Sequence, residues 1–318
     1  MIIVDFATGE ANLTWTGIVE ALEAGHRRPR AEIGDLLLGS GENRMLNRAA
    51  WIDGLGIAMK SVTVFAGNPR RDPPLPSVQG GVLLFDHESG APLALVDGPL
   101  VTKWKTAGDS LLGARRLARP DAKRLLVCGA GTLAKSLIEA YSAGFEALED
   151  IRVWNRSQDR AEALIEEMGG IGARISVAHD LEEAVRESDI VSTATMASEP
   201  FLKGEWLAPG THVDLIGAYR PDMREADDAV LTRGRLFVDS FETTIGHIGE
   251  IEIPLRAGTI TRETILGDLN DIVAETTGRQ DKDEITVFKN GGGAHLDLMT
   301  ARHILDRLDE PSAAQSAG

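Results

Sequence analysis

The sequence predicts an α/β protein with a doubly wound parallel sheet, joined to a smaller α+β domain built on a largely antiparallel sheet. Three observations predict this fold. From Arg124 onward, short apolar runs alternate with helical patterns, as in a parallel sheet covered by helices on both faces. A glycine-rich turn follows the first of these runs. In the first 115 residues, extended runs instead flank a Pro- and Arg-rich loop at 67–77 and a tight turn.

The alternating half contains the expected strands of the parallel sheet and the helices between them. Apolar residues recur at helical spacing from Leu133 to Tyr141, and again from Ala161 to Met168. The predicted strands are Arg124–Cys128, Ile151–Trp154, Arg174–Ala178, Ile190–Ala194, His212–Ile216, Leu236–Asp239 and Ile285–Phe288.

The first part of the chain predicts strands at Ile57–Phe65, Gly81–Asp86 and Pro92–Asp97, followed by a helix from about Lys103 to Leu117. Arg119-Pro120 then marks a natural boundary. We therefore expect one domain over residues 1–118 with a C-terminal helix at 293–310, a second over 119–292, and a disordered tail at 311–318.

Composition excludes several classes of function. The 318 residues carry a net charge of −16, which disfavours binding to nucleic acid or to an anionic membrane surface. The chain has one cysteine, Cys128, and its first residues lack the basic start of a signal peptide. No apolar run approaches the roughly 18 residues of a membrane span. We expect a cytoplasmic enzyme.

The glycine-rich turn predicts a dinucleotide site in a Rossmann-type domain. Gly129 and Gly131 open a G-x-G-x-x-A motif between an expected strand and a helix that starts near Thr132 and Leu133. Glycines in this context let the backbone approach a pyrophosphate, whose charge lies at the helix N-terminus.

The end of the next strand indicates which nicotinamide cofactor is used. An NAD site favours an acidic residue here, to accept hydrogen bonds from the ribose. This chain has Asn155, Arg156 and Ser157 instead. Because a guanidinium pairs with a 2′-phosphate that a carboxylate would repel, we expect NADPH, with NADH possible.

Besides the glycine-rich turn, eight further short stretches act as recognisable motifs: Ala58–Ser61, Leu93–Gly98, Thr102–Ser110, Thr193–Thr195, Pro209–Val213, Ile216–Ala218, Arg220–Asp222 and Gly292–Asp297. With the glycine loop, they make the sequence similar to the ornithine cyclodeaminase/μ-crystallin family over nearly its whole length. The resemblance implies a dinucleotide domain, a second domain that binds substrate and forms a homodimer, and chemistry on a small anionic amino or imino acid.

The resemblance also implies roles for individual residues. It assigns cofactor contacts to Thr195, Ile216, Gly217 and Ala218, beside those of the glycine loop. On the substrate side it implies Lys60, as substrate-binding and catalytic residue, with Lys105, Arg30, Ser77 and Gly291; Arg48 is the alternative to Arg30.

Individual positions favour one branch of the family. Cyclodeaminases have a catalytic aspartate where this chain has Tyr219, a lysine at Met223 and an acidic residue at Asn155. Ketimine reductases also lack that aspartate and share the Asn-Arg-Ser/Thr run. Lys105 stands where most members have arginine, which weakens the transfer of that arginine's role, because lysine has no planar fork.

Two lysine positions are also unusual on physical grounds. Strand alternation places Lys60 on one face with Ala58 and Val62, an apolar setting for an ammonium. With Thr102 as the expected N-cap, Lys103 and Lys105 would lie in a first helical turn, where the helix dipole disfavours cations unless an anion binds there.

The resulting hypothesis is an NAD(P)H-dependent reductase of a small cyclic imino acid, Δ1-pyrroline-2-carboxylate or Δ1-piperideine-2-carboxylate, giving L-proline or L-pipecolate. The alternatives are an ornithine cyclodeaminase, another amino-acid or opine-type dehydrogenase, and a non-catalytic NADPH-dependent ligand-binding protein. The spacing of His212, His247 and His295 predicts no metal site.

Overall fold

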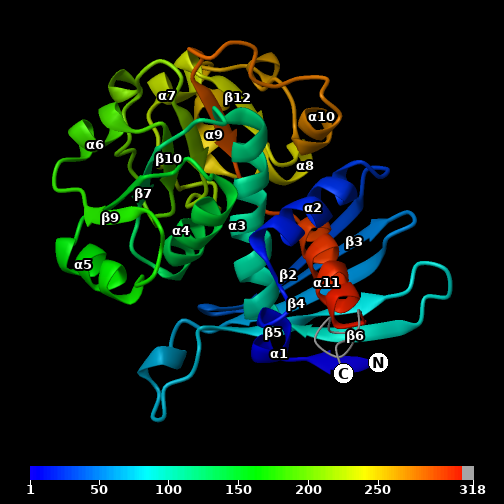
Figure 1. Cartoon of the computed structure of the whole chain (residues 1–318). Helices are drawn as coiled ribbons and strands as arrows, with labels where there is room; N and C mark the ends of the chain where they lie inside the picture. Colours follow the sequence, from blue (N-terminus) through cyan, green and yellow to red (C-terminus); the bar gives the residue numbers. More distant parts are fainter. Residues whose placement is uncertain (310–318) are drawn as a thin grey trace, which may run out of the picture. The chain divides into compact units, whose positions relative to one another are not determined.

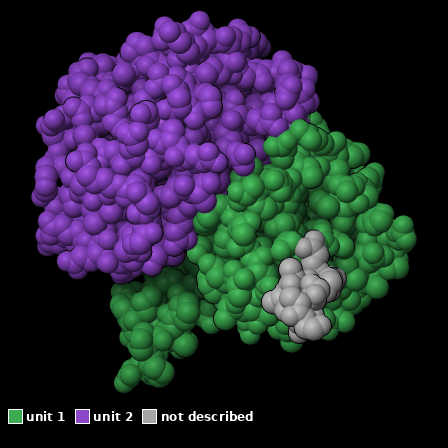
Figure 2. Space-filling view, in the orientation of Figure 1, with its two compact units in different colours: residues 1–105, 293–318 green, residues 106–292 purple. Residues whose placement is uncertain are grey.

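The computed structural model describes residues 1–309, which fall into two compact units (Figure 2). Of the described residues, unit 1 contains 1–105 and 293–309, and unit 2 contains 106–292. The first boundary lies inside helix α3 (Gly98–Leu117), ahead of the position at 118 expected from the sequence. The predicted tail at 311–318 lies outside the described residues.

Unit 1 is built on a six-stranded sheet in the order β1-β6-β5-β4-β3-β2 (Figure 1). β1 pairs with β6 in parallel and the other neighbours pair antiparallel, which confirms the largely antiparallel sheet. Three strands that the sequence pattern did not reveal, β1 to β3, complete it. The bounds are β1 Ile2–Val4, β2 Glu32–Ser40, β3 Asn43–Ile52, β4 Gly56–Val64, β5 Val78–Phe85 and β6 Pro92–Asp97.

Helix α11 (Ala294–Asp309) packs across β3, β4 and β5 and against helix α2 (Trp15–His26). It therefore brings the end of the described chain onto the sheet face that carries Lys60. Short helices α1 (Phe6–Glu10) and η1 (Asn68–Arg70) complete the unit.

The expected start of helix α3 is wrong. The helix begins at Gly98, and the Asp97 carboxylate accepts a 2.8 Å hydrogen bond from the Leu100 amide. Asp97 thus caps the helix, and Pro99 is tolerated in its first turn because no intrahelical donor is needed there. Thr102 and Lys105 consequently lie beyond the first turn, so the helix dipole gives no reason to place an anion at Lys105.

Unit 2 contains a seven-stranded sheet in the order β12-β13-β11-β10-β7-β8-β9, with every neighbouring pair parallel. This confirms the doubly wound sheet. The strand order reverses between β7 and β10, the place where such sheets bind ligands at their carboxyl edge. The bounds are β7 Arg124–Cys128, β8 Asp150–Trp154, β9 Arg174–Val177, β10 Ile190–Thr193, β11 His212–Leu215, β12 Arg235–Val238 and β13 Thr286–Lys289.

Helices flank this sheet and bury its apolar residues, among them Val191, Val213 and Val287. Among the described residues, no helix is long and apolar enough to cross a bilayer. The helices besides α3 are α4 Thr132–Gly144, α5 Gln158–Glu167, α6 Leu181–Glu187, α7 Asp228–Arg233, α8 Phe241–Thr244, α9 Gly249–Ala257 and α10 Leu269–Val273, with short η2 Gly204–Trp206 and η3 Arg262–Thr264.

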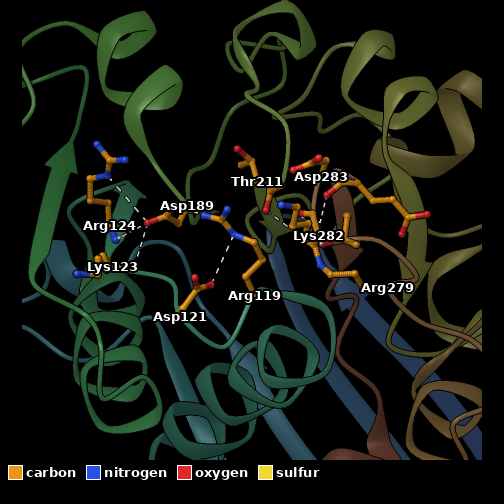
Figure 3. A network of polar contacts seen from close by, with 12 residues as sticks. Arg119, Asp121, Lys123, Arg124, Asp189, Thr211, Arg279, Lys282 and Asp283 are labelled. Atoms are coloured by element: carbon orange, nitrogen blue, oxygen red, sulfur yellow. Dashed lines mark hydrogen bonds and ion pairs between the residues drawn. The ribbon is translucent and has the colours of Figure 1, made fainter.

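Ion pairs and hydrogen bonds fasten the amino edge of this sheet (Figure 3). The Asp189 carboxylate accepts bonds from the Arg119 guanidinium and from the backbone amides of Lys123 and Arg124, at 2.5, 2.9 and 3.0 Å. Arg279 donates to the Leu117 and Gly210 carbonyls and to the Thr286 hydroxyl, at 2.6, 3.2 and 3.0 Å. These contacts lie at the edge opposite to the one where the loops after β7, β8 and β10 leave the sheet.

Candidate active site

A cavity of about 600 Å³ opens at the carboxyl edge of the sheet in unit 2, lined by the loops that follow β7, β8 and β10. It lies where the strand order reverses, as the fold predicts for a dinucleotide. Six residues that the sequence assigned to the cofactor line it: Gly129, Gly131, Asn155, Arg156, Ser157 and Thr195. Thr132 and Leu133 form the first turn of α4 beside the cavity.

The two glycines of the loop differ in their structural reason. Gly129 has a φ of +128°, and a Cβ there would lie 2.6 Å from the Ala194 carbonyl oxygen. Gly131 is the N-cap of α4, and a Cβ there would meet no atom within 4 Å. Gly129 thus allows β7 and β10 to approach closely, while Gly131 leaves room before the helix N-terminus. These features fit a dinucleotide pyrophosphate.

The loop after β8 presents cationic and neutral polar groups to the cavity. The Asn155 amide donates a 2.8 Å hydrogen bond to the Ser157 carbonyl, which shapes the turn that carries Arg156. Arg156 is exposed and lines the cavity together with Arg160. Two guanidinium groups at this position fit the extra phosphate of NADPH.

A buried glutamate, which the sequence analysis did not single out, joins the loops after β10 and β11. Glu225 accepts hydrogen bonds from the Thr195 amide and hydroxyl, both at 2.7 Å, and from the Gly217 amide at 2.6 Å. It therefore holds two of the loops predicted to contact the cofactor. Ile216 and Ala218, on either side of Gly217, are buried.

Gly291 also belongs to unit 2, where a Cβ would lie 2.7 Å from the Thr244 hydroxyl and 3.2 Å from an Asp239 oxygen. Its lack of a side chain is required by this packing. Near it, Lys289 is fully buried and its ammonium donates to the Leu215 and Asn290 carbonyls at 3.0 and 2.9 Å. Burial lowers the pKa of Lys289, an effect opposed by the carboxylates of Glu250 and Glu225.

Unit 1 brings together two lysines and one carboxylate from distant parts of the sequence. The Lys60 ammonium, on β4, donates to the Thr102 hydroxyl at 2.8 Å and to Asp297 Oδ1 at 3.1 Å. The Lys105 ammonium, on α3, lies 3.2 Å from the same Oδ1. All three charged side chains are buried, with relative exposures of 8, 6 and 1% for Lys60, Lys105 and Asp297. Lys60 is buried on the same strand face as Ala58 and Val62, as the alternation predicts, but its ammonium meets polar and charged groups there.

Burial and mutual charge shift the pKa values of this cluster. Burial lowers the pKa of Lys105 to about 8, despite the opposing attraction of Asp297. Burial alone would raise the pKa of Asp297, but Lys105 and Lys60 hold that pKa below its usual value. The cluster therefore combines one carboxylate with two lysines, one of which can exchange a proton near neutral pH.

The remaining substrate-side residues lie at different distances from this cluster. Arg48 pairs with Lys60 in the β3–β4 register and forms a 3.0 Å ion pair with Asp35. Arg30 is exposed in the loop before β2, and Ser77 is partly buried just before β5. Of the two arginines proposed from the sequence, Arg48 is the one whose position the sheet fixes beside Lys60.

Lys103 points elsewhere. Its ammonium forms a 2.7 Å ion pair with Glu10 and lies 5.5 Å from the ring centroid of Trp104. Lys103 and Lys105 therefore have different anionic partners, Glu10 and Asp297. Side chains two positions apart on a helix point in different directions, and only that of Lys105 turns toward Asp297.

Tyr219 and Met223, two of the positions that distinguish cyclodeaminases from ketimine reductases, follow β11 at the carboxyl edge of the sheet in unit 2. Tyr219 is 55% exposed, and the Arg220 guanidinium lies 5.5 Å from its ring centroid. Met223 is buried against Ala218 and Ile248. Neither side chain supplies a carboxylate. Within residues 1–309, no group of His, Cys, Asp and Glu is arranged to hold a metal ion.

The sequence profile of the ornithine cyclodeaminase/mu-crystallin family matches residues 50–312. The chain belongs to this family. It is 54% identical over 299 residues to a Δ1-pyrroline-2-carboxylate reductase of Paracoccus denitrificans, covering 94% of this chain and 93% of that protein.

Two solved structures of family-like fold superpose over almost the whole chain. A Δ1-pyrroline-2-carboxylate reductase of Thermococcus litoralis, in complex with NADH and L-proline, has a TM-score of 0.89 at 30% identity and covers 96% of this chain and 97% of that one. A dimeric archaeal alanine dehydrogenase with bound NAD has a TM-score of 0.87 at 27% identity, with coverages of 96 and 95%. Both structures hold a nicotinamide cofactor on this fold, and the reductase also holds L-proline.

Proposed function

We propose that this chain is an NAD(P)H-dependent reductase of a small cyclic imino acid, converting Δ1-pyrroline-2-carboxylate or Δ1-piperideine-2-carboxylate to L-proline or L-pipecolate. The observation that carries the proposal is the extensive identity with the Paracoccus reductase, over 94% of the chain. The dinucleotide cavity of unit 2 and the lysine pair of unit 1 support it independently, because the reaction needs a nicotinamide and an anion-binding group.

Lys60 and Lys105 are assigned to the substrate carboxylate. Two ammonium groups on one carboxylate leave a net positive charge in a buried setting, where an anion gains more than it would in water. Lys60 is further assigned as the catalytic residue that gives or orients the proton at the imine nitrogen. The bound cofactor supplies the hydride that the imine carbon accepts.

The cofactor is assigned to the cavity of unit 2, with Gly129, Gly131 and Thr195 at the pyrophosphate and nicotinamide side. Arg156 is assigned to the 2′-phosphate, so NADPH is preferred and NADH is the weaker cofactor. We assign substrate binding and dimerisation to unit 1, and a cytoplasmic location to the enzyme, where NADPH is available and Cys128 stays reduced.

A second copy of this chain is proposed to cover the outer face of the sheet in unit 1. The register places a row of exposed apolar side chains on the face opposite α11, and a patch of this kind marks an interaction surface. The similar archaeal dehydrogenase is a dimer. The side chains are Ile3, Leu36, Leu38, Met45, Trp51, Met59 and Leu95.

The dimer is tested by light scattering. Leu38→Lys should give a monomer, whereas Ile253→Lys, an equally apolar exposed position in unit 2, should leave the dimer intact. A dimer that persists in Leu38→Lys would place the interface elsewhere.

The reaction is tested by following NADPH oxidation with each cyclic imine, beside ammonia release from L-ornithine. We expect oxidation with the imines and no ammonia, because Tyr219 is a phenol and cannot serve as a carboxylate base near neutral pH. Ammonia and proline formed from ornithine with catalytic NAD would favour the cyclodeaminase. Tight binding of NADPH and an imine without turnover would favour a binding protein.

A further inference from the structure

One oxygen of the Asp297 carboxylate contacts the ammonium groups of both Lys60 and Lys105. Oδ1 lies 3.1 Å from the Lys60 ammonium and 3.2 Å from the Lys105 ammonium. Oδ2 is also buried and accepts no hydrogen bond from the described residues. A buried carboxylate is costly unless it is paired, so its position at the junction of β4, α3 and α11 depends on these two cations.

The charged groups that act on Lys105 come from three elements of unit 1: Asp297 lies on α11, Lys60 on β4 and Arg48 on β3. His295, also on α11, feels the charge of Lys105 and lies against His26 of α2. Burial lowers the pKa of His295 well below its usual value, so this ring is neutral at physiological pH. Burial, Lys60 and Arg48 all favour loss of the Lys105 proton, and Asp297 opposes them.

We propose that Asp297 is a positioning residue for imine reduction: it holds the two ammonium groups together and keeps Lys105 in its charged, anion-binding form. This inference rests on the proposed function. Without the carboxylate, two buried cations would repel each other and Lys105 would become a neutral amine, which cannot pair with the substrate carboxylate. Asp297 would thereby set the alkaline limit of substrate binding without touching the substrate.

The pH dependence of kcat/KM tests this role. Because burial lowers the pKa of Lys105 to about 8, we expect kcat/KM of the unmodified enzyme to fall above about pH 8. Asp297→Asn keeps the size and one acceptor but removes the charge. In Asp297→Asn, this alkaline limb (the fall in kcat/KM at high pH) should begin about 1–3 pH units lower, the usual effect of one close charge.

Two variants separate the charge from the packing. Asp297→Glu keeps the carboxylate, so its alkaline limb should stay near that of the unmodified enzyme even if kcat/KM falls. Lys105→Arg carries a guanidinium that does not lose its proton, so its limb near pH 8 should vanish. Adding Asp297→Asn to Lys105→Arg should then cause no downward shift. An Asp297→Asn limb that stays at its original pH, or a shift that persists in the Lys105→Arg background, would overturn the proposal.

A readout without turnover distinguishes failure of this inference from failure of the proposed function. NMR of the ¹⁵N-labelled lysine side chains, with Lys105→Arg to assign the signal, should show Lys105 titrating near pH 8 and lower in Asp297→Asn. This measurement needs no substrate, so it remains decisive if neither imine is reduced. If Asp297→Asn does not fold, Asp297→Ser takes its place, and Lys105 should again titrate at a lower pH. Unchanged NADPH binding shows that either variant is folded.

Discussion

The backbone amide of Gly217 donates a 2.6 Å hydrogen bond to Oε2 of Glu225. The same carboxylate accepts the Thr193 hydroxyl and the Thr195 amide, each at 2.7 Å. Thr195 follows β10 and Gly217 follows β11, so one buried side chain joins two adjacent loops at the carboxyl edge of the sheet. The Glu225 amide itself donates at 2.7 Å to the buried carboxylate of Glu250, which holds the segment in place.

Glu225→Gln should weaken NADPH binding by about tenfold. A glutamine has one acceptor oxygen, so at least one of the loop amides at Thr195 and Gly217 would face a donor, and a buried unsatisfied donor costs about 1–3 kcal/mol. Fluorescence titration with NADPH measures the change, with the exposed Glu242→Gln as control. Unaltered affinity in a folded Glu225→Gln protein would mean that the loops keep their positions without this carboxylate.

Arg156→Ala should reduce the affinity for NADPH by roughly 10- to 150-fold, because a charge-assisted hydrogen bond contributes about 1.5–3 kcal/mol. Affinity for NADH should barely change, since that cofactor lacks the 2′-phosphate. Dissociation constants for both cofactors are compared with those of Arg186→Ala, an exposed arginine outside the cavity. Equal losses for NADPH and NADH would show that Arg156 does not read the phosphate.

Lys60→Met should lower kcat by about 10²–10⁴-fold, the range for loss of a general acid, with NADPH affinity unchanged. If Lys60 binds the carboxylate equally in the ground and transition states, KM would rise and kcat would stay nearly constant. Steady-state kinetics on both imines separate the two roles. Lys103→Met is the matched control, because Lys103 pairs with Glu10 and not with Asp297. Normal kinetics in Lys60→Met would remove the catalytic assignment.

The contribution of His212 to the free energy of unfolding should fall as the pH drops below about 6.5, against opposing contributions from Glu250 and Asp214, whose pKa values burial raises to about 7 and about 6. Burial, with a contribution from Arg279, lowers the pKa of His212 from 6.5 to about 3. The unfolded chain therefore takes up a proton between pH 6.5 and 3 that the folded chain excludes, so stability is lost over that range. By pH 5 the loss from this residue is about 2 kcal/mol.

Urea unfolding at several pH values checks this dependence. His212→Asn keeps a polar group near the Thr286 hydroxyl, which lies 2.9 Å from His212 Nδ1, and removes this contribution. Its free energy of unfolding, relative to that of the unmodified protein, should therefore rise as the pH falls from 6.5 to 5. The exposed His179→Asn should leave the pH dependence as it is. A pH dependence that is the same in both variants would assign the acid sensitivity to other groups.

Local sequence signals sufficed for the parts of the protein whose structure depends on neighbouring residues. The glycine loop, the strand-helix alternation after Arg124 and the Asn155–Ser157 turn all appear in unit 2 as expected, because period and turn chemistry act over a few residues. The pattern missed β2 and β3, since most of their side chains are exposed or partly exposed and the apolar run at Leu36–Leu38 does not alternate.

The sequence by itself therefore determined the fold class, the dinucleotide loop and the presence of Lys60 on a buried strand face. Only the tertiary structure decided that Lys60 meets Asp297, which lies 237 positions away, and that Lys105 shares the same carboxylate oxygen. It also decided that Glu225 joins two loops of the cofactor cavity. The physical reason is that desolvation and ion pairing depend on which distant elements pack around a group, and no local pattern encodes that environment.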